Sequence, residues 1–268
     1  MTELRATSAD GHPVTALVDG SGPTTLLVVH PGGSDASTWD DVTRHLAAEF
    51  RVVRIRRRIY AGGAEIALPH SMAVEAADIL AVARLLTAPV VLVGHSSGAV
   101  AALEAALLEP SACNGLFLYE PPMPTTELLC GPAAAHARAA LDAGDPVEAM
   151  RIHMRDIVRM PAAIVDAMFA DPGAQGLFAA YAAAQIADDE AIDALGAGID
   201  RFTTLDLPTT FLEGDLSPAH LRERVADLAA TLPNAKVVTL TGQGHIAHLT
   251  ASESLANVIR DAVSRPQR

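Results

Sequence analysis

Apolar residues along the chain follow two alternating patterns: short continuous runs, and longer alanine-rich segments with the period of a helix. Continuous runs rich in Val, Leu and Ile are typical of strands buried on both faces of a parallel sheet. Their alternation with helical segments predicts βαβ units and an α/β fold with a mainly parallel sheet. The runs are Thr25–Val29, Val52–Ile55, Val90–Val93, Leu116–Tyr119, Thr209–Leu212 and Val237–Leu240.

The pattern changes at the start of the chain and in its middle. Two half-apolar stretches between Leu4 and Val18, separated by Asp10 and Gly11, predict an antiparallel hairpin at the sheet edge. Between residues 121 and 206 the strand pattern stops and proline-punctuated helical patterns replace it. We therefore predict a core formed by residues 1–121 and 206–268, with an all-helical cap or lid inserted at 122–205.

One helix start inside the predicted cap is well defined. Asp145 precedes Pro146, and Glu148 stands three residues after the aspartate, which is a favourable arrangement for the first turn of a helix. Gly144 just before it predicts the end of the preceding helix.

Composition narrows the possible functions. The 268 residues include 32 acidic and 19 basic side chains, a net charge of −13, which argues against a nucleic-acid partner. Cys113 and Cys130 are too few for a disulfide scaffold and lack metal-ligand spacing, so we expect free thiols. The start has no apolar stretch of signal-peptide type, and the longest apolar runs are interrupted, which favours a soluble cytoplasmic protein without membrane contact.

The strongest chemical motif is Gly94-His95-Ser96-Ser97-Gly98, which connects a predicted buried strand directly to a predicted helix. A nucleophile elbow requires this context: the serine sits on a sharp turn, and side chains at the two glycine positions would collide across it. Ser96 is therefore the candidate nucleophile. The alternative is an ordinary glycine-rich turn between a strand and a helix.

Two further loops complete a possible site. His30-Pro31-Gly32-Gly33 follows the run Thr25–Val29 and is similar to loops that supply an oxyanion-hole amide. Proline has no N–H, so the amide must come from Gly32 or Gly33, paired with that of Ser97. We interpret His30 as structural.

The general base is expected near the other end of the chain. The turn Gly242-Gln243-Gly244 follows the last predicted strand and leads directly into His245. In the chain order serine, acid, histidine, the base comes last. His245 is favoured over His248, which we expect to begin a helix or line a pocket.

Together these motifs, from about residue 10 to residue 262, resemble the α/β-hydrolase superfamily. That resemblance implies an α/β-hydrolase core with a helical cap, but it leaves the triad acid open. Members usually carry the acid after the strand here predicted at Thr209–Leu212, where this chain has Ser217 at the expected place and Asp215 two residues earlier. Haloalkane dehalogenases and zearalenone-type lactonases instead place a glutamate after the strand that follows the elbow. Glu120 occupies that position and becomes the expected acid, with Asp215 in reserve.

The resemblance implies a serine hydrolase that cleaves a small, largely apolar ester or lactone with no metal or organic cofactor. A serine at the elbow argues against the dehalogenase and epoxide hydrolase families, which use a carboxylate nucleophile. The alternatives are an acyltransferase, a C–C bond hydrolase or a non-catalytic ligand-binding homologue. Self-association into a homodimer stays open. The remaining charged feature, Arg54 with Arg56-Arg57-Arg58, is interpreted as surface ion pairs rather than an anion site.

Overall fold

A computed structural model describes residues 2–61, 66–87 and 89–264. Within them, an eight-stranded sheet runs in the order β1-β2-β4-β3-β5-β6-β7-β8. The edge hairpin is antiparallel and β2 pairs antiparallel to β4, whereas every pairing from β4 to β8 is parallel. The strands are β1 (Thr2–Thr7), β2 (Pro13–Asp19), β3 (Thr25–Val29), β4 (Arg51–Ile55), β5 (Val90–His95), β6 (Gly115–Tyr119), β7 (Thr209–Gly214) and β8 (Ala235–Leu240). The predicted strands, hairpin and fold class are confirmed.

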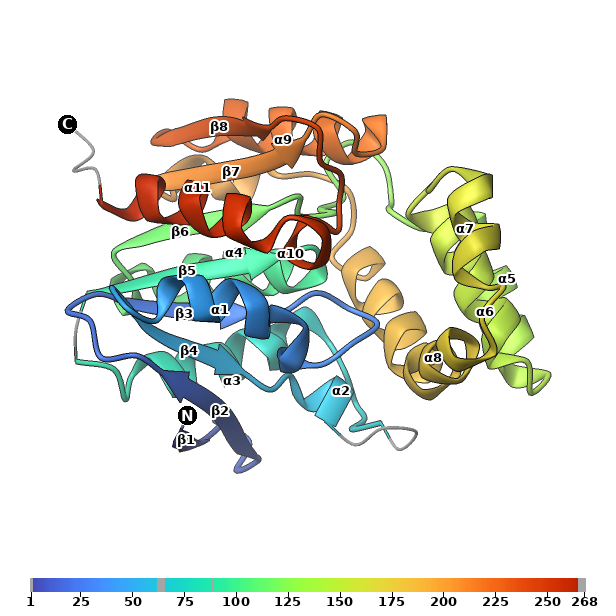
Figure 1. Cartoon of the computed structure of the whole chain (residues 1–268), viewed down its shortest axis with the longest axis horizontal. Coiled ribbons are helices and arrows are strands. Elements are labelled where there is room, and N and C mark those ends of the chain that lie inside the picture. Colours follow the sequence, from blue (N-terminus) through green and yellow to red (C-terminus); the bar gives the residue numbers. More distant parts are fainter. Residues whose placement is uncertain (1, 62–65, 88, 265–268) are drawn as a thin grey trace.

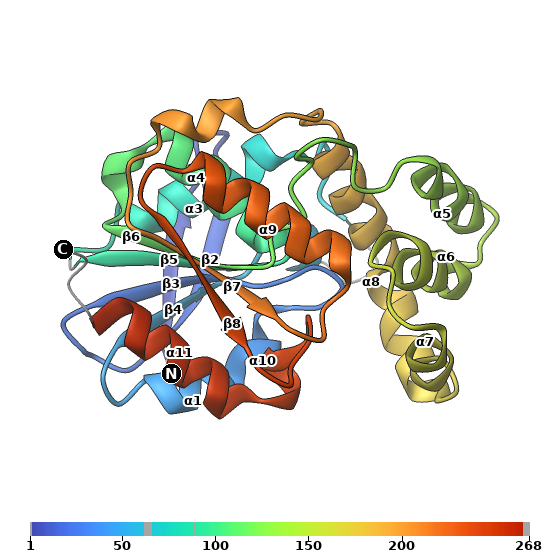
Figure 2. The same cartoon turned by 90° about the horizontal axis from the view of Figure 1, so that it is seen from above.

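Helices cover both faces of the sheet, as Figure 2 shows. The sheet can be apolar on both faces because each is sealed by a helical layer, and β3 and β6 are buried along their whole length. One layer contains α3 (Met72–Ala83), α4 (Ser97–Leu108) and α9 (Ala219–Thr231). The other contains α1 (Asp40–Leu46), α10 (Ala247–Thr250) and α11 (Ser252–Ser264).

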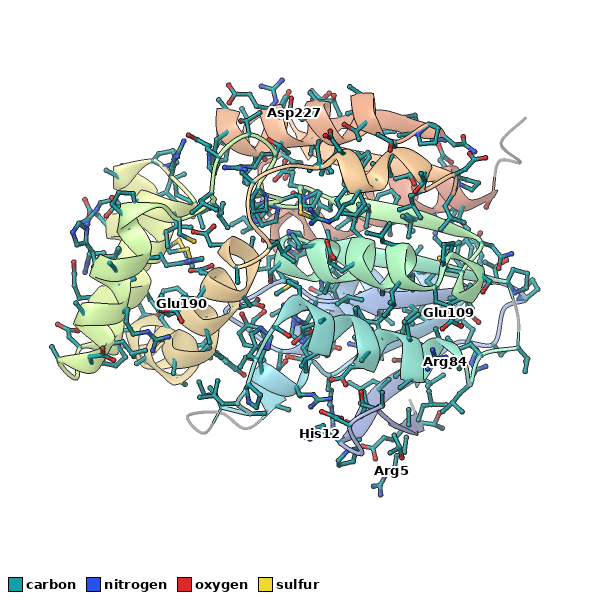
Figure 3. The ribbon with its side chains drawn as sticks, turned by 180° about the vertical axis from the view of Figure 1, so that it is seen from behind. Arg5, His12, Arg84, Glu109, Glu190 and Asp227 are labelled. Atoms are coloured by element: carbon teal, nitrogen blue, oxygen red, sulfur yellow. The ribbon has the colours of Figure 1, made fainter. Side chains whose placement is uncertain are left out.

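The segment between β6 and β7 is helical throughout its regular elements, and its residues 132–193 lie beyond the carboxyl ends of the parallel strands (Figure 1). It contains α5 (Pro132–Asp142), α6 (Pro146–Ile152), the π turn His153–Ile157, α7 (Ala162–Met168), α8 (Pro172–Asp193) and the 3₁₀ turn Asp200–Thr204. Asp145 caps α6 as expected, because its side chain accepts a hydrogen bond from the Glu148 amide at 2.9 Å. Arg138 of α5 pairs with Glu190 of α8, which Figure 3 labels, at 2.7 Å.

The remaining elements are short: α2 (Arg58–Ala61) and the 3₁₀ turns Ala36–Trp39 and Pro110–Ala112. Cys113 and Cys130 are buried and free, as expected. Among the residues that the structure describes, no helix combines the length and apolar character needed to cross a membrane.

Candidate active site

The turn from β5 into α4 has the geometry of a nucleophile elbow. Ser96 adopts φ 53° and ψ −128°, a strained conformation for a residue with a side chain. A Cβ added to Gly94 would lie 2.4 Å from the Ala99 Cα, and one added to Gly98 would lie 2.4 Å from the His30 carbonyl oxygen. Both glycines therefore permit backbone contacts that any other residue would prevent.

Ser96, His245 and Glu120 form one continuous chain of hydrogen bonds. His245 Nε2 lies 3.0 Å from Ser96 Oγ, and His245 Nδ1 lies 2.5 Å from Glu120 Oε2. A carboxylate only accepts, so Nδ1 donates to Glu120 and Nε2 accepts from the serine hydroxyl. This tautomer is the one that lets an imidazole remove the serine proton.

Glu120 is fixed on both sides of its carboxylate. It is fully buried, it adopts φ 43°, and its Oε1 accepts a hydrogen bond from the Gly214 amide at 2.7 Å. Its own amide donates to the Leu212 carbonyl at 3.0 Å, so β7 holds both ends of the residue. The carboxylate is thereby locked toward His245.

Asp215, the alternative candidate for the triad acid, bonds a different part of the chain. Asp215 Oδ1 accepts a hydrogen bond from the Gly242 amide at 2.7 Å and stabilises the turn after β8. In the described part of the chain, no hydrogen bond joins Asp215 to His245. Ser217, which stands where the α/β-hydrolase resemblance places the usual acid, is buried. The structure therefore brings Glu120, and not Asp215, to the histidine.

The predicted oxyanion-hole residues lie around the same cavity. Gly32, Gly33 and Ser97 all line it together with Ser96. Gly33 has φ 68°, a conformation that favours glycine. The Ser97 hydroxyl accepts a hydrogen bond from Arg57 Nη1 at 2.8 Å, so a buried side chain holds the residue that follows the candidate nucleophile.

Comparison with known proteins identifies the family of the chain. The family model described as "Alpha/beta hydrolase family" matches residues 26–258. The chain belongs to the alpha/beta hydrolase family. No curated protein sequence matches it.

Solved structures of other alpha/beta hydrolases share the fold over nearly the whole chain. An alpha/beta hydrolase from Sphaerobacter thermophilus is 27% identical, with a TM-score of 0.82 over 97% of this chain and 100% of the other. A thermophilic esterase from Thermogutta terrifontis is 21% identical, with a TM-score of 0.74 over 98% of each chain. An esterase from Rhodococcus is 19% identical, with a TM-score of 0.73 over 98% and 99%.

Two residues that the sequence analysis missed hold the histidine loop of this hydrolase. His95 Nε2 donates to the His245 carbonyl at 2.9 Å, and the Tyr119 hydroxyl donates to the Gly244 carbonyl. The two rings stack with centroids 4.4 Å apart, because the residues pair in register at the ends of β5 and β6. His95 directly precedes Ser96, and Tyr119 directly precedes Glu120. This position next to a predicted site residue is the only feature of the sequence that could have indicated their role.

Other histidines around the site are kept neutral by burial. Burial lowers the pKa of His30 to about 3, and that of His248 to about 3. His30 Nδ1 lies 2.8 Å from the Pro31 carbonyl, in keeping with a structural role. His248 lines the cavity and stacks on Trp39 with centroids 6.1 Å apart.

The interpretation of the arginine run as surface ion pairs is wrong for three of its four members. Arg56 is exposed and pairs with Glu3, but Arg54, Arg57 and Arg58 are buried. Arg57 is fully enclosed and bonds Glu75 at 2.9 Å and Asp188 at 2.7 Å. Burial alone would raise the pKa of Asp188, yet Arg57 and His70 hold it below its ordinary value. These ion pairs compensate for the burial of the arginine. The partners lie far from Arg57 in the sequence, so the local sequence did not predict them.

The cavity of the hydrolase has a volume of about 210 Å³ and lies between the core loops and the helical segment. On the core side it reaches Ser96, His245 and His248. Most of its helical side is apolar, formed by Met154, Ile157, Met160, Met168, Leu177 and Phe178. Among the described residues, no group of three or more His, Cys, Asp or Glu side chains is arranged to hold a metal ion.

Proposed function

We propose that the protein is a serine hydrolase that cleaves a carboxylic ester or lactone of a small, largely apolar molecule through an acyl-enzyme. The observation that carries this proposal is the unbroken hydrogen-bond chain from Glu120 through His245 to Ser96, which opens into the cavity. The two esterases named above share less than 25% identity with the chain and show its fold. The ester assignment therefore rests on the site.

The first half of the reaction forms the acyl-enzyme. Ser96 Oγ bonds to the carbonyl carbon while His245 Nε2 takes the hydroxyl proton, and the carbonyl π electrons move onto oxygen. Amides of Ser97 and of Gly32 or Gly33 stabilise this oxyanion. The bond to the leaving oxygen then breaks, and His245 gives its proton to the departing alkoxide.

Water completes the cycle. His245 takes a proton from the water as its oxygen attacks the acyl carbon, and the collapse of the second tetrahedral intermediate returns that proton to Ser96 Oγ. Glu120 stabilises the imidazolium at both stages and keeps Nδ1 protonated. An ester yields an acid and an alcohol, whereas a lactone yields one hydroxy acid.

Residues 122–205 act as the cap in this proposal. The apolar wall supplied by this segment suits an apolar acyl or alcohol group, and the cavity volume of about 210 Å³ suits a small one. The same triad would serve an acyltransferase or a C–C bond hydrolase. A non-catalytic binding homologue would have no need of the aligned serine, histidine and glutamate, so reactivity at Ser96 distinguishes an enzyme from a binder.

Replacement of the candidate nucleophile tests the proposal. The parent should hydrolyse p-nitrophenyl esters and become covalently labelled by a fluorophosphonate on the peptide that contains Ser96. Ser96→Ala should lose labelling and at least about 10⁴-fold in turnover, because the acyl-enzyme forms on this hydroxyl. Thermal unfolding should be almost unchanged. A panel of ester chain lengths and lactone ring sizes then identifies the preferred substrate.

Ser37→Ala is the matched control, because Ser37 is exposed near the oxyanion loop and should leave labelling and turnover intact. Activity of Ser96→Ala within about tenfold of the parent would contradict the covalent mechanism. An absence of both turnover and labelling in the folded parent would favour the binding homologue.

A further inference from the structure

A polar cluster interrupts the otherwise apolar cap wall of the cavity. His153 stands at the start of the π turn that follows α6, while Gln185 and Asp189 lie one turn apart on α8. All three line the same cavity as Ser96. The proposed hydrolysis gives none of them a role.

The cluster is a second carboxylate–imidazole pair. His153 Nδ1 lies 2.7 Å from Asp189 Oδ2, and Gln185 Nε2 donates to Asp189 Oδ1 at 2.8 Å. The Asp189 side chain is 3% exposed and that of His153 is 10% exposed. With both carboxylate oxygens accepting, His153 carries its proton on Nδ1 and presents Nε2 as an acceptor.

His153 Nε2 has no hydrogen-bond partner among the described residues. In the free protein, water can satisfy a cavity-lining nitrogen. A bound apolar substrate would displace that water and leave the acceptor unpaired, which costs binding free energy. A substrate with a hydrogen-bond donor at this position avoids that cost.

The charges around the cluster favour a neutral donor over an anion. No lysine or arginine in the described part of the chain forms an ion pair with Asp189, whereas its neighbour Asp188 pairs with Arg57. Burial raises the pKa of the Asp189 carboxyl, so negative charge is already costly there. A carboxylate ligand would add a second negative charge beside it. A hydroxyl group supplies the donor without charge.

We infer that His153, oriented by Asp189, binds a hydroxyl group that the substrate carries away from the carbonyl attacked by Ser96. The inference rests on the proposed function and narrows its substrate class to hydroxylated esters or lactones, phenolic or alcoholic, of otherwise apolar molecules. His153 is thus a specificity residue, and Asp189 is the positioning residue that fixes its tautomer.

Matched ester pairs test the inference during turnover. The substrates are p-nitrophenyl esters of phenylacetic, phenylpropanoic and phenylbutanoic acids, each with and without a para hydroxyl group. For at least one chain length the parent should prefer the hydroxylated ester by about tenfold in kcat/KM, the effect of one net hydrogen bond. His153→Leu should reduce that ratio to below about twofold while unsubstituted esters are still hydrolysed.

Two further variants distinguish recognition from folding. His153→Leu leaves the buried Asp189 carboxylate without its imidazole, which can destabilise the cap. The double variant His153→Leu/Asp189→Leu removes both partners and should also lose the preference. His153→Gln, which keeps an amide oxygen as acceptor, should retain part of it. His136→Leu, an exposed position on α5, is the matched control and should keep the parent ratio.

Binding without chemistry provides the independent measurement. Calorimetry compares ethylbenzene, para-ethylphenol and para-ethylbenzoate, which differ only in the group offered to His153. The parent should bind the phenol about tenfold more tightly than the hydrocarbon, and His153→Leu should lose this difference. Phenol selectivity in a parent that hydrolyses no ester would overturn the proposed function and support the hydroxyl site. Equal binding of phenol and hydrocarbon, or a preference for the benzoate, would overturn the hydroxyl site even if ester hydrolysis is efficient.

Discussion

Two carboxylate–imidazole pairs face one cavity, one from the core and one from the cap. In the core pair, Glu120 is fully buried and His245 presents Nε2 to Ser96 at 3.0 Å. In the cap pair, Asp189 is almost as buried, but Nε2 of His153 meets no hydroxyl group among the residues that the structure describes. Under the two proposals above, the same carboxylate–imidazole pair has two chemical uses. Where a strained elbow brings a serine to Nε2 it forms a base for catalysis, and where it does not, it offers an acceptor to a ligand.

The two pairs also differ in how they are anchored. Glu120 is held by the backbone of β7, through the Gly214 amide and the Leu212 carbonyl. Asp189 is held by a side chain of its own helix, Gln185. Both anchors belong to regular elements of the fold, which hold side chains more precisely than loops do. The core anchor uses backbone groups of the sheet, whereas the cap anchor uses one side chain.

The largest effect is expected from breaking the core pair at its carboxylate. Glu120→Gln keeps the size of the side chain but no longer enforces the proton on Nδ1 of His245. Turnover should fall by about 10⁴-fold with little change in KM, as happens when a triad histidine adopts the wrong tautomer. Steady-state kinetics on the best p-nitrophenyl ester measures both parameters.

Asp215→Asn is the matched control for this substitution. It changes the other candidate acid, whose carboxylate bonds the Gly242 amide, and should lower turnover by less than about tenfold. If Asp215→Asn is the more damaging variant, the assignment of the acid to Glu120 is wrong.

The next largest effect is expected where α8 of the cap contacts the core. Asp188 and Asp189 are adjacent on α8 but serve opposite sides: Asp188 binds Arg57 in the core, whereas Asp189 binds His153 in the cap wall. Arg57→Met would leave two buried carboxylates, Glu75 and Asp188, without the arginine that pairs with both, although His70 still lies 3.0 Å from Asp188. The free energy of unfolding should fall by about 3–5 kcal/mol, the usual cost of breaking a buried ion pair on one side. Urea denaturation measures it.

An exposed arginine pair provides the contrast. Arg84 and Glu109, labelled in Figure 3, form an ion pair on the surface. Arg84→Met should leave the free energy of unfolding almost unchanged, because solvent screens such pairs. Similar losses in Arg57→Met and Arg84→Met would show that the buried network contributes no more than a surface contact.

The sequence predicts the strands well because a buried strand is indicated by a short run of neighbouring apolar residues. Continuous apolar runs such as Thr25–Val29 became strands buried on both faces. Gly94 and Gly98 revealed the elbow because close backbone approach leaves few alternatives to glycine. The position of Glu120 came from a family resemblance, since nothing in its neighbours distinguishes it from a surface residue at a strand end.

Contacts between residues far apart in the chain could not be predicted from the sequence. Arg57 and Asp188 lie 131 positions apart, and each alone is typical of a solvated surface. His153 and Asp189 belong to separate helical elements, so their pairing depends on how the cap packs. His95 is part of the elbow motif, but nothing in the sequence indicated its bond to the His245 carbonyl. In each case a charge or imidazole is buried because of a partner that only the fold supplies.

The smallest effect is expected from two buried histidines, His30 and His248. His30 and His248 form no hydrogen bond to a carboxylate in the part of the chain that the structure describes, and burial lowers the pKa of each to about 3. The unfolded chain takes up their protons near pH 6.5, whereas the folded protein does so only near pH 3. Their stabilising contribution is therefore complete above about pH 6.5 and is lost progressively as the pH falls.

For each of these histidines, acidification from about pH 7.5 to about pH 5 should cost about 2 kcal/mol of unfolding free energy. His248→Leu removes one proton-binding site from the unfolded chain, so the variant should lose about 2 kcal/mol less than the parent over that interval. Urea denaturation of both proteins at the two pH values gives this difference directly, independently of how much the substitution itself destabilises the fold. The exposed His136→Leu should behave as the parent does. Equal pH sensitivity in His248→Leu and the parent would mean that His248 takes up its proton at the same pH in the folded and the unfolded chain, which would contradict a pKa lowered by burial.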